Sequence, residues 1–127
     1  MTHAEIEVWA TAYINALQDQ TLLKVRGHPL WWAIEKFMPS LFGSASADDC
    51  WAAILEILSR NPPDKVIEVL AAGPLEDLIK SHGPEVIERV EAESRRNPAF
   101  RDLLGGVWRS STPDIWARVV KAQGKLW

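Results

Sequence analysis

Apolar side chains recur at helical spacing along nearly the whole chain, and no segment shows the strict alternation of apolar and polar residues that is typical of strands. The pattern predicts helices over residues 3–18, 30–38, 48–60, 64–72, 75–82, 85–96, 99–104 and 114–123. Because most of these segments are short and follow one another closely, we expect an all-α fold. It should contain about seven or eight helices, arranged as a bundle or a small solenoid-like array.

Proline and glycine residues separate the predicted helices of the second half. A proline stands just before each apolar stretch and a glycine just after most of them: Pro63, Pro74, Pro84, Pro98 and Pro113, and Gly73, Gly83, Gly105 and Gly124. Proline fits the first helical turn and glycine the residue past the last one, so this order is typical of helix boundaries. Thr2, Ser46 and Ser111 are expected N-caps, and Pro39 is expected to end the second helix.

Length and composition favour one globular domain. The chain has 127 residues, of which 47% are apolar and 24% charged, enough for a hydrophobic core. Residues 43–47 are the most linker-like segment but are too short to separate two domains. We therefore expect residues 1–127 to form a single domain, with a helical pair over 1–42 and a helical core over 46–124.

Three features favour a cytoplasmic protein without membrane contact. No apolar run approaches the roughly 20 residues that span a bilayer. The first residues lack the basic start and apolar stretch of a signal peptide. The single Cys50 cannot form an internal disulfide.

The net charge of −3 hides an uneven distribution. Residues 61–94 hold eight acidic and three basic side chains, whereas residues 95–127 hold two acidic and seven basic ones. The two segments either neutralise each other in the fold or form a dipolar surface that steers a charged partner. The basic side chains are Arg95, Arg96, Arg101, Arg109, Arg118, Lys121 and Lys125. They allow a nucleic-acid interaction, although the negative total charge makes nucleic acid an unlikely main ligand.

Several short motifs follow one another in the C-terminal two thirds of the chain. They are Ala71-Ala72-Gly73-Pro74-Leu75-Glu76-Asp77-Leu78, His82-Gly83, Ile87-Glu88-Arg89-Val90-Glu91, Arg95-Arg96-Asn97-Pro98-Ala99-Phe100-Arg101, Gly106-Val107-Trp108 and Trp116-Ala117-Arg118-Val119. Their order resembles a bacterial domain-of-unknown-function family, uncharacterised family 6869, whose members share a Gly-Pro-Leu-Glu-Asp core and a Gly-Val-Trp element. The resemblance covers roughly residues 48–122. It implies a helical fold and a bacterial origin, and it brings no established activity.

Catalytic and metal-binding motifs are weak in this sequence. Glu35 stands among aromatic residues, where a raised pKa would suit a general acid. No second carboxylate can be assigned to it, so a solvent-facing or salt-bridged role is expected. His28, His82 and Cys50 lack the spacing of zinc ligands. We expect no metal and no cofactor, with His82 near a helix C-terminus and Cys50 buried on an apolar face.

Tryptophan supplies the best aromatic candidate for a partner surface. Of the seven tryptophans, Trp9, Trp51 and Trp116 fall on apolar helix faces and are expected in the core. The buried stripe of the second helix is expected at Leu30, Ile34, Phe37, Met38 and Leu41. Trp32 points away from that stripe, so it either packs under a loop or serves as an exposed anchor.

Acidic side chains supply the rest of the expected partner surface. Glu76 and Asp77 open a predicted helix, where they either complement the helix dipole or accept hydrogen bonds from a basic partner. Glu85, Glu88 and Glu91 are expected to project outward from the next helix. Pairing of Glu85 with Arg89 and of Glu91 with Arg95 leaves Glu88 as the best candidate for an intermolecular contact.

These features favour a non-enzymatic protein-binding module. One specific form is a bacterial immunity or antitoxin-like inhibitor that occludes a partner protein, such as a toxin or effector. Two alternatives stay open: a nucleic-acid-associated accessory protein that uses the basic C-terminal segment, and an enzyme with an unrecognised carboxylate site.

Overall fold

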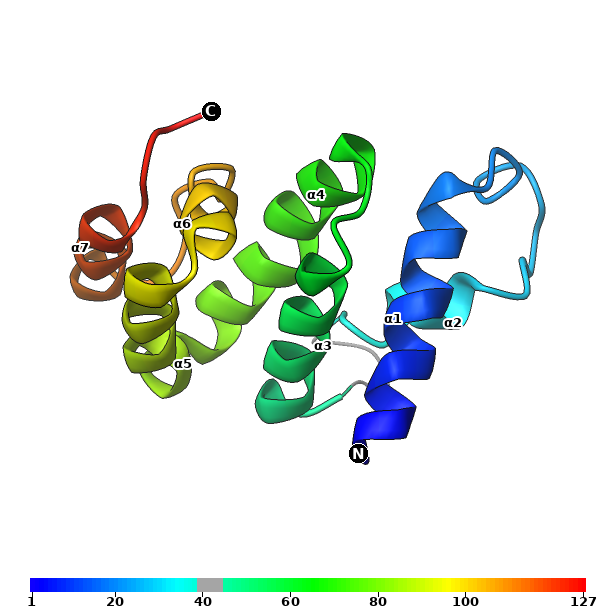
Figure 1. The fold of residues 1–127 in the computed structure, drawn as a ribbon, viewed down its shortest axis with the longest axis horizontal. Helices are drawn as coiled ribbons and strands as arrows, with labels where there is room; N and C mark the ends of the chain where they lie inside the picture. Colours follow the sequence, from blue (N-terminus) through cyan, green and yellow to red (C-terminus); the bar gives the residue numbers. More distant parts are fainter. Residues whose placement is uncertain (39–44) are drawn as a thin grey trace. The chain divides into compact units, whose positions relative to one another are not determined.

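The computed structural model describes residues 1–38 and 45–127, which form two compact units, residues 1–66 and 67–127. All regular structure within these described ranges is helical, which confirms the predicted all-α class (Figure 1). The described ranges contain six helical segments, slightly fewer than the seven or eight expected. The difference arises in the second unit, where predicted helices run together.

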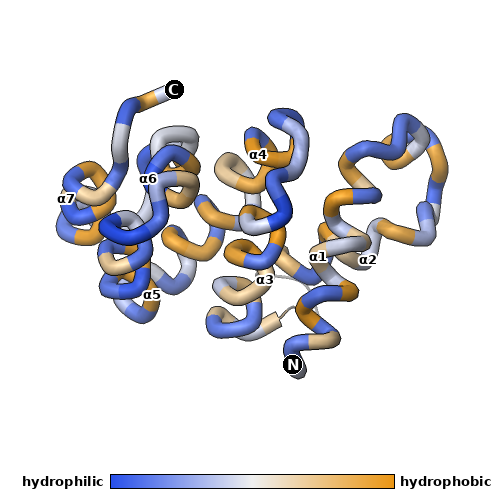
Figure 2. Tube along the Cα trace, in the orientation of Figure 1, coloured by the Kyte–Doolittle hydropathy of each residue, from blue (hydrophilic) through white to orange (hydrophobic). Residues whose placement is uncertain are grey.

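The first unit is built on helix α1 (His3–Gln18), which packs against α2 (Trp31–Glu35) and α3 (Ala47–Ser59). Hydrophobic positions recur along these helices at the spacing that one buried face requires (Figure 2). Trp9 is fully buried; its indole ring lies 4.3 Å from the ring of Phe37, and its Nε1 donates to the carbonyl oxygen of Ala33 at 2.8 Å. The core of this unit is therefore centred on one tryptophan of α1.

Two of the predicted N-caps are confirmed in the first unit. The Thr2 hydroxyl accepts from the Glu5 amide while the Glu5 carboxylate accepts from the Thr2 amide, which completes a capping box on α1. The Ser46 hydroxyl accepts from the Asp49 amide at 3.2 Å and caps α3. Helix α2 is shorter than the predicted 30–38 segment. The expected roles of Pro39 and Leu41, and the first two residues of the expected linker, lie outside the described residues.

The second unit contains most of one long helical path. Helix α4 (Asp64–Leu70) begins in the first unit and continues through a π-helical turn, η1 (Ala71–Leu75), into α5 (Glu76–Arg96). The predicted separation at Pro74 is therefore wrong, because Pro74 lies inside the π-helical turn. The predicted break near Pro84 is present as a kink: His82, at φ −132° and ψ 28°, is not helical and divides α5 into two helical parts. Each proline removes one backbone donor, and a local bulge or kink accommodates that loss.

Helices α6 (Pro98–Leu104) and α7 (Pro113–Ala122) pack against α5 (Figure 1). Gly83 permits this packing: a Cβ there would lie 2.6 Å from the Ser111 hydroxyl oxygen and 3.1 Å from a methyl carbon of Ile115. Gly83 is thus a point of close approach within the second unit, directly after the non-helical His82.

The N-cap of α7 differs from the prediction by one residue. The Thr112 hydroxyl, not Ser111, accepts from the Ile115 amide, at 3.4 Å. Ser111 has φ +68°, a left-handed conformation that leads the chain into the helix. Both residues carry a hydroxyl that can cap, so sequence alone does not separate them.

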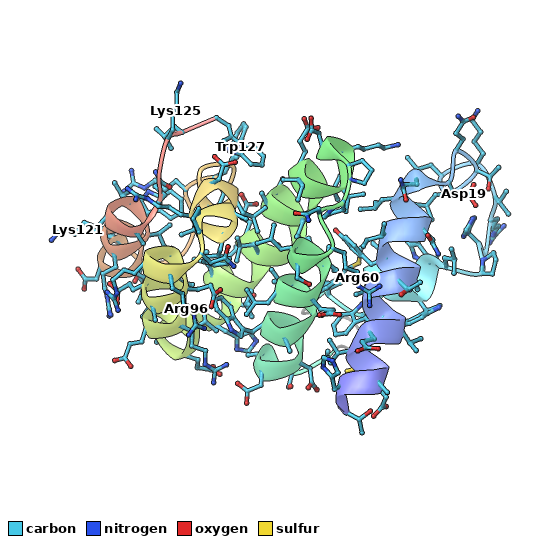
Figure 3. The ribbon with its side chains drawn as sticks, in the orientation of Figure 1. Asp19, Arg60, Arg96, Lys121, Lys125 and Trp127 are labelled. Atoms are coloured by element: carbon cyan, nitrogen blue, oxygen red, sulfur yellow. The ribbon has the colours of Figure 1, made fainter. Side chains whose placement is uncertain are left out.

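The chain after α7 packs onto the end of α6. The Trp127 amide donates to the Gly105 carbonyl oxygen at 3.2 Å, and its indole Nε1 donates to the Asp102 carbonyl oxygen at 3.0 Å. Figure 3 shows Trp127 beside α6, and a Cβ on Gly106 would collide with its ring. Gly105 caps the C-terminus of α6, as the glycine pattern predicts.

Candidate functional site

A shallow hollow of about 320 Å³ lies on the first unit between α1 and α2. Its lining is mostly apolar and consists of Met1, Ala4, Glu5, Val8, Trp32 and Lys36. Helical spacing produces much of this lining: residues 4, 5 and 8 fall on one side of α1, and Met1 precedes the helix. The hollow therefore combines the unburied side of α1 with a tryptophan of α2.

Trp32 remains 41% exposed and Val8 61% exposed, although both line this hollow. Trp32 thus packs partly against α1 and keeps much of its ring in water, between the two alternatives that the sequence left open. Lys36 stands at the rim with its Nζ 5.6 Å from the centre of the Trp9 ring, so a cation lies close to the apolar surface. An exposed aromatic ring in a hollow with charged edges is typical of a protein-binding anchor.

The tryptophan predictions are only partly correct. Trp9 is buried as expected, but Trp51 and Trp116 are half-buried and do not lie fully in the core. Trp108 is 78% exposed, the most exposed tryptophan in the described residues, and sequence reasoning missed it. It follows α6 in a loop, where no helical stripe exists against which its orientation could be judged.

Glu76 has an internal role. Its Oε1 accepts a hydrogen bond from the Trp108 amide at 3.0 Å, which joins the start of α5 to the loop after α6. The amide of Glu76 already donates back into η1, so the open helix terminus expected at this point is absent. Asp77 is half-buried, and burial together with the nearby Glu76 charge raises the pKa of its carboxyl.

Glu91 is not the outward-facing acid that the sequence predicts. Its two carboxylate oxygens accept from Arg118 of α7, one of them from Nε at 2.9 Å and the other from a terminal guanidinium nitrogen. These hydrogen bonds hold the pKa of Glu91 below its usual range, helped by the charges of Arg95 and Lys121. Of the predicted acidic strip, Glu85 and Glu88 are exposed, and Glu85 contacts His82 at 3.0 Å.

The acidic and basic segments neutralise each other in part. Besides the pair between Glu91 and Arg118, buried Glu93 accepts from the guanidinium of Arg96 and from the side-chain amide of Asn97 at 2.9 Å. Figure 3 shows Arg96 at the end of α5. Burial opposes the charged form of Glu93, but these hydrogen bonds still hold its pKa below the ordinary value. Internal pairing thus accounts for two of the acidic charges that residues 61–94 carry.

The remaining candidates have structural surroundings. His28 is buried, its Nε2 lies 2.9 Å from an Asp19 carboxylate oxygen, and its Nδ1 accepts from the Leu30 amide at 3.1 Å. Cys50 is buried as expected, and burial raises the pKa of its thiol to about 11. Glu35 is exposed at the end of α2, as expected. His82 lies at the kink that divides α5, at the end of its first helical part, as expected.

Two searches of the described residues gave negative results. Within residues 1–38 and 45–127, no three His, Cys, Asp or Glu side chains are grouped closely enough to hold a metal ion. No helix in the same ranges has the length and apolar character needed to cross a bilayer.

The model of a family of unknown function, DUF6869, matches residues 20–126. The chain belongs to DUF6869. The match extends further toward the N-terminus than the expected 48–122. No curated protein and no solved structure matches the chain.

The structure connects two segments of the sequence, residues 73–77 and residues 106–108. Glu76, from Gly-Pro-Leu-Glu-Asp, accepts the hydrogen bond of the Trp108 amide, from Gly-Val-Trp. Val107, the residue before Trp108, is buried, whereas the Trp108 ring is exposed. In this DUF6869 chain, the two segments therefore form one contact that fixes the backbone of a loop and presents a tryptophan to solvent.

Proposed function

We propose that this DUF6869 chain is a non-enzymatic protein-binding module that uses the Trp32 hollow as its main contact. An apolar side chain of the partner enters between Val8 and Trp32, and Glu5 and Lys36 form the polar rim. The observation that carries the proposal is the exposure of Val8 and Trp32 side by side in a hollow of about 320 Å³. Partly exposed tryptophan is among the residues that most often dominate binding energies at protein interfaces.

The specific form of the proposal is an inhibitor in the cytoplasm that occludes the active site of a partner, as an immunity or antitoxin protein does. Exposed Glu85 and Glu88 of the second unit favour a partner with a basic face, because such charges accelerate encounter. Glu76 and Glu91 contribute less, since each already accepts an internal hydrogen bond.

A second candidate, a nucleic-acid-associated accessory protein, is favoured by one observation. One hollow of the second unit is bordered by four cationic side chains, Arg95, Arg101, Arg118 and Lys121. The acidic residues of α5 stand on the same helix as Arg95, and their charges repel an extended polyanion. We therefore rank this function below protein binding.

The test begins with capture of partners on immobilised full-length chain and continues with the purified partner. We expect Trp32→Ala to raise the Kd by about 30-fold, which corresponds to about 2 kcal/mol. Trp108→Ala is the matched control, because it removes an equally large and more exposed ring from the other unit. It should change the Kd by less than about twofold if Trp32 is the anchor. Glu88→Lys separately reports on the acidic residues and should slow association.

Thermal melting of each variant separates binding from folding. Trp32→Ala should lower the melting temperature less than Trp9→Ala, because Trp9 is fully buried and Trp32 is not. Two outcomes would show that the hollow is not the contact site. The purified partner could bind the wild type and Trp32→Ala with equal affinity, or the immobilised wild type and Trp32→Ala could retain the same proteins.

A further inference from the structure

A second hollow, of about 380 Å³, lies wholly within the second unit. Three helices contribute its polar lining: α5 supplies Glu91, Ser94 and Arg95, α6 supplies Arg101, and α7 supplies Arg118 and Lys121. Four cationic side chains thus surround one carboxylate. The lining carries three positive charges in excess, in a chain whose total charge is −3.

The single carboxylate shows how this cluster treats an anion. Glu91 binds the guanidinium of Arg118 through both oxygens, and this interaction lowers the pKa of Glu91. Arg95 and Lys121 lower it further through their charges alone. The positive potential of the hollow therefore already stabilises one oxyanion, the Glu91 carboxylate. The charges of Arg95, Arg101 and Lys121 can stabilise a second one.

We propose that this hollow binds a compact phosphate-bearing small molecule, held by Arg95, Arg101 and Lys121 with Arg118 behind them. A phosphate carries up to two negative charges and several acceptor oxygens, so it matches the excess charge better than a carboxylate does. The volume falls within the range of small-molecule sites, about 300–1,000 Å³, so the rest of the ligand can extend beyond its phosphate.

The surroundings of the hollow favour a compact ligand over a nucleic acid. Glu88 lies one helical turn before Glu91 on α5 and is exposed, and its charge acts on Arg118. Glu85 is exposed one turn further along the same helix. An extended polyanion that followed α5 out of the hollow would therefore meet negative charge, whereas a ligand of the size of the hollow would not.

The test titrates the full chain, labelled with nitrogen-15, with inorganic pyrophosphate at low ionic strength and records arginine Nε and backbone amide shifts. We expect saturable shifts that centre on Arg95, Arg101 and Lys121, of which Lys121 is labelled in Figure 3. The double variant Arg95→Gln/Lys121→Gln should weaken binding by at least about tenfold, as expected for the loss of a charge-assisted hydrogen bond. Glu91→Gln should strengthen binding, because it removes the competing carboxylate while it keeps the shape of the side chain.

The matched control is Arg109→Gln combined with Lys125→Gln, which removes the same two charges from exposed positions outside the hollow. If this control weakens pyrophosphate as much as Arg95→Gln/Lys121→Gln does, the binding is diffuse attraction and the proposal is wrong. A ten-nucleotide single strand is the second probe. Tighter binding of that strand than of pyrophosphate, with loss of affinity in both double variants, identifies a nucleic-acid surface and also overturns the proposal.

Discussion

The junction between α5 and α6 depends on one buried carboxylate, and its removal gives a sharp prediction. Glu93 is 6% exposed and accepts from the Asn97 side-chain amide and from Arg96. Asn97 in turn caps α6, because its side-chain oxygen accepts from the Phe100 amide at 3.2 Å. Glu93 therefore orients the residue that starts the next helix, and Pro98 in the first turn fixes the direction of the chain.

The magnitudes follow from these bonds. Loss of an asparagine N-cap costs about 1 kcal/mol, and a buried acceptor left without its donor costs about 1–3 kcal/mol. We therefore expect Asn97→Ala to destabilise the protein by about 2–4 kcal/mol. Glu93→Gln keeps the shape and some hydrogen bonding but loses the charge, so we expect about 1–2 kcal/mol. Arg96 adds little to that figure, because its side chain is 73% exposed and its bond is screened by solvent.

Because the two residues share a hydrogen bond, their effects should not add. A double-mutant cycle measured by urea unfolding, followed by circular dichroism, should give a coupling of about 0.5–1.5 kcal/mol between Glu93→Gln and Asn97→Ala. Ser59→Ala, on the exposed end of α3, is a control that should show no coupling with either. Additivity within about 0.3 kcal/mol would refute the idea that Glu93 acts through the cap.

The pH dependence provides an independent check with a defined sign. The pKa of Glu93 in the folded protein lies below its ordinary value of 4.5. The stability that its charge contributes is therefore complete above pH 4.5 and is lost as the pH falls through the lowered value. Glu93→Gln should remove this part of the acid sensitivity, so the stability difference between wild type and variant should shrink below about pH 4. A difference that stays constant from pH 7 to pH 3 would contradict the assigned role.

Two further predictions concern separate features: the contact between Glu76 and Trp108, and the buried thiol of Cys50. Glu76→Ala should speed hydrogen exchange of the Trp108 amide by about tenfold, because the amide loses its acceptor. Asp77→Ala should leave the exchange rate of that amide unchanged. Equal exchange rates in the wild type and both variants would exclude the contact in solution. Cys50 should react slowly with a thiol reagent at pH 8, because a pKa of about 11 leaves only about one thiol in a thousand as thiolate. A reaction as fast as in urea-unfolded protein would show that the thiol is not buried.

Much of the fold could be predicted from the sequence, because helical spacing and capping are local. Helix α1 has the predicted bounds, and Thr2 and Ser46 cap the predicted helices. Pro74 misled the prediction of a helix boundary, whereas the boundary predicted near Pro84 is present as a kink at His82. A proline shows that one backbone hydrogen bond is missing, but it does not show whether the chain turns away or continues through a π-helical turn or a kink. That outcome depends on packing, as at Gly83, where the chain before α7 lies too close for a Cβ.

The candidate sites were harder to predict because their contacts join residues far apart in the chain. Pairing at i,i+4 assigns Glu91 to Arg95, whereas its hydrogen-bond partner is Arg118, 27 residues away on α7. The same packing brings basic residues from three helices around one hollow, although in the sequence they resemble a scattered basic tail. Trp32 was identifiable from the sequence because it lies inside a helix whose stripe can be drawn, and Trp108 was not because it lies in a loop. Glu91, which the sequence predicts to contact a partner, is thus already bound internally to Arg118. The side chains left to contact a ligand in the hollow of the second unit are mainly cationic. For this reason we assign protein binding to the Trp32 hollow and anion binding to the second unit, and variants in one hollow should leave the other interaction unchanged.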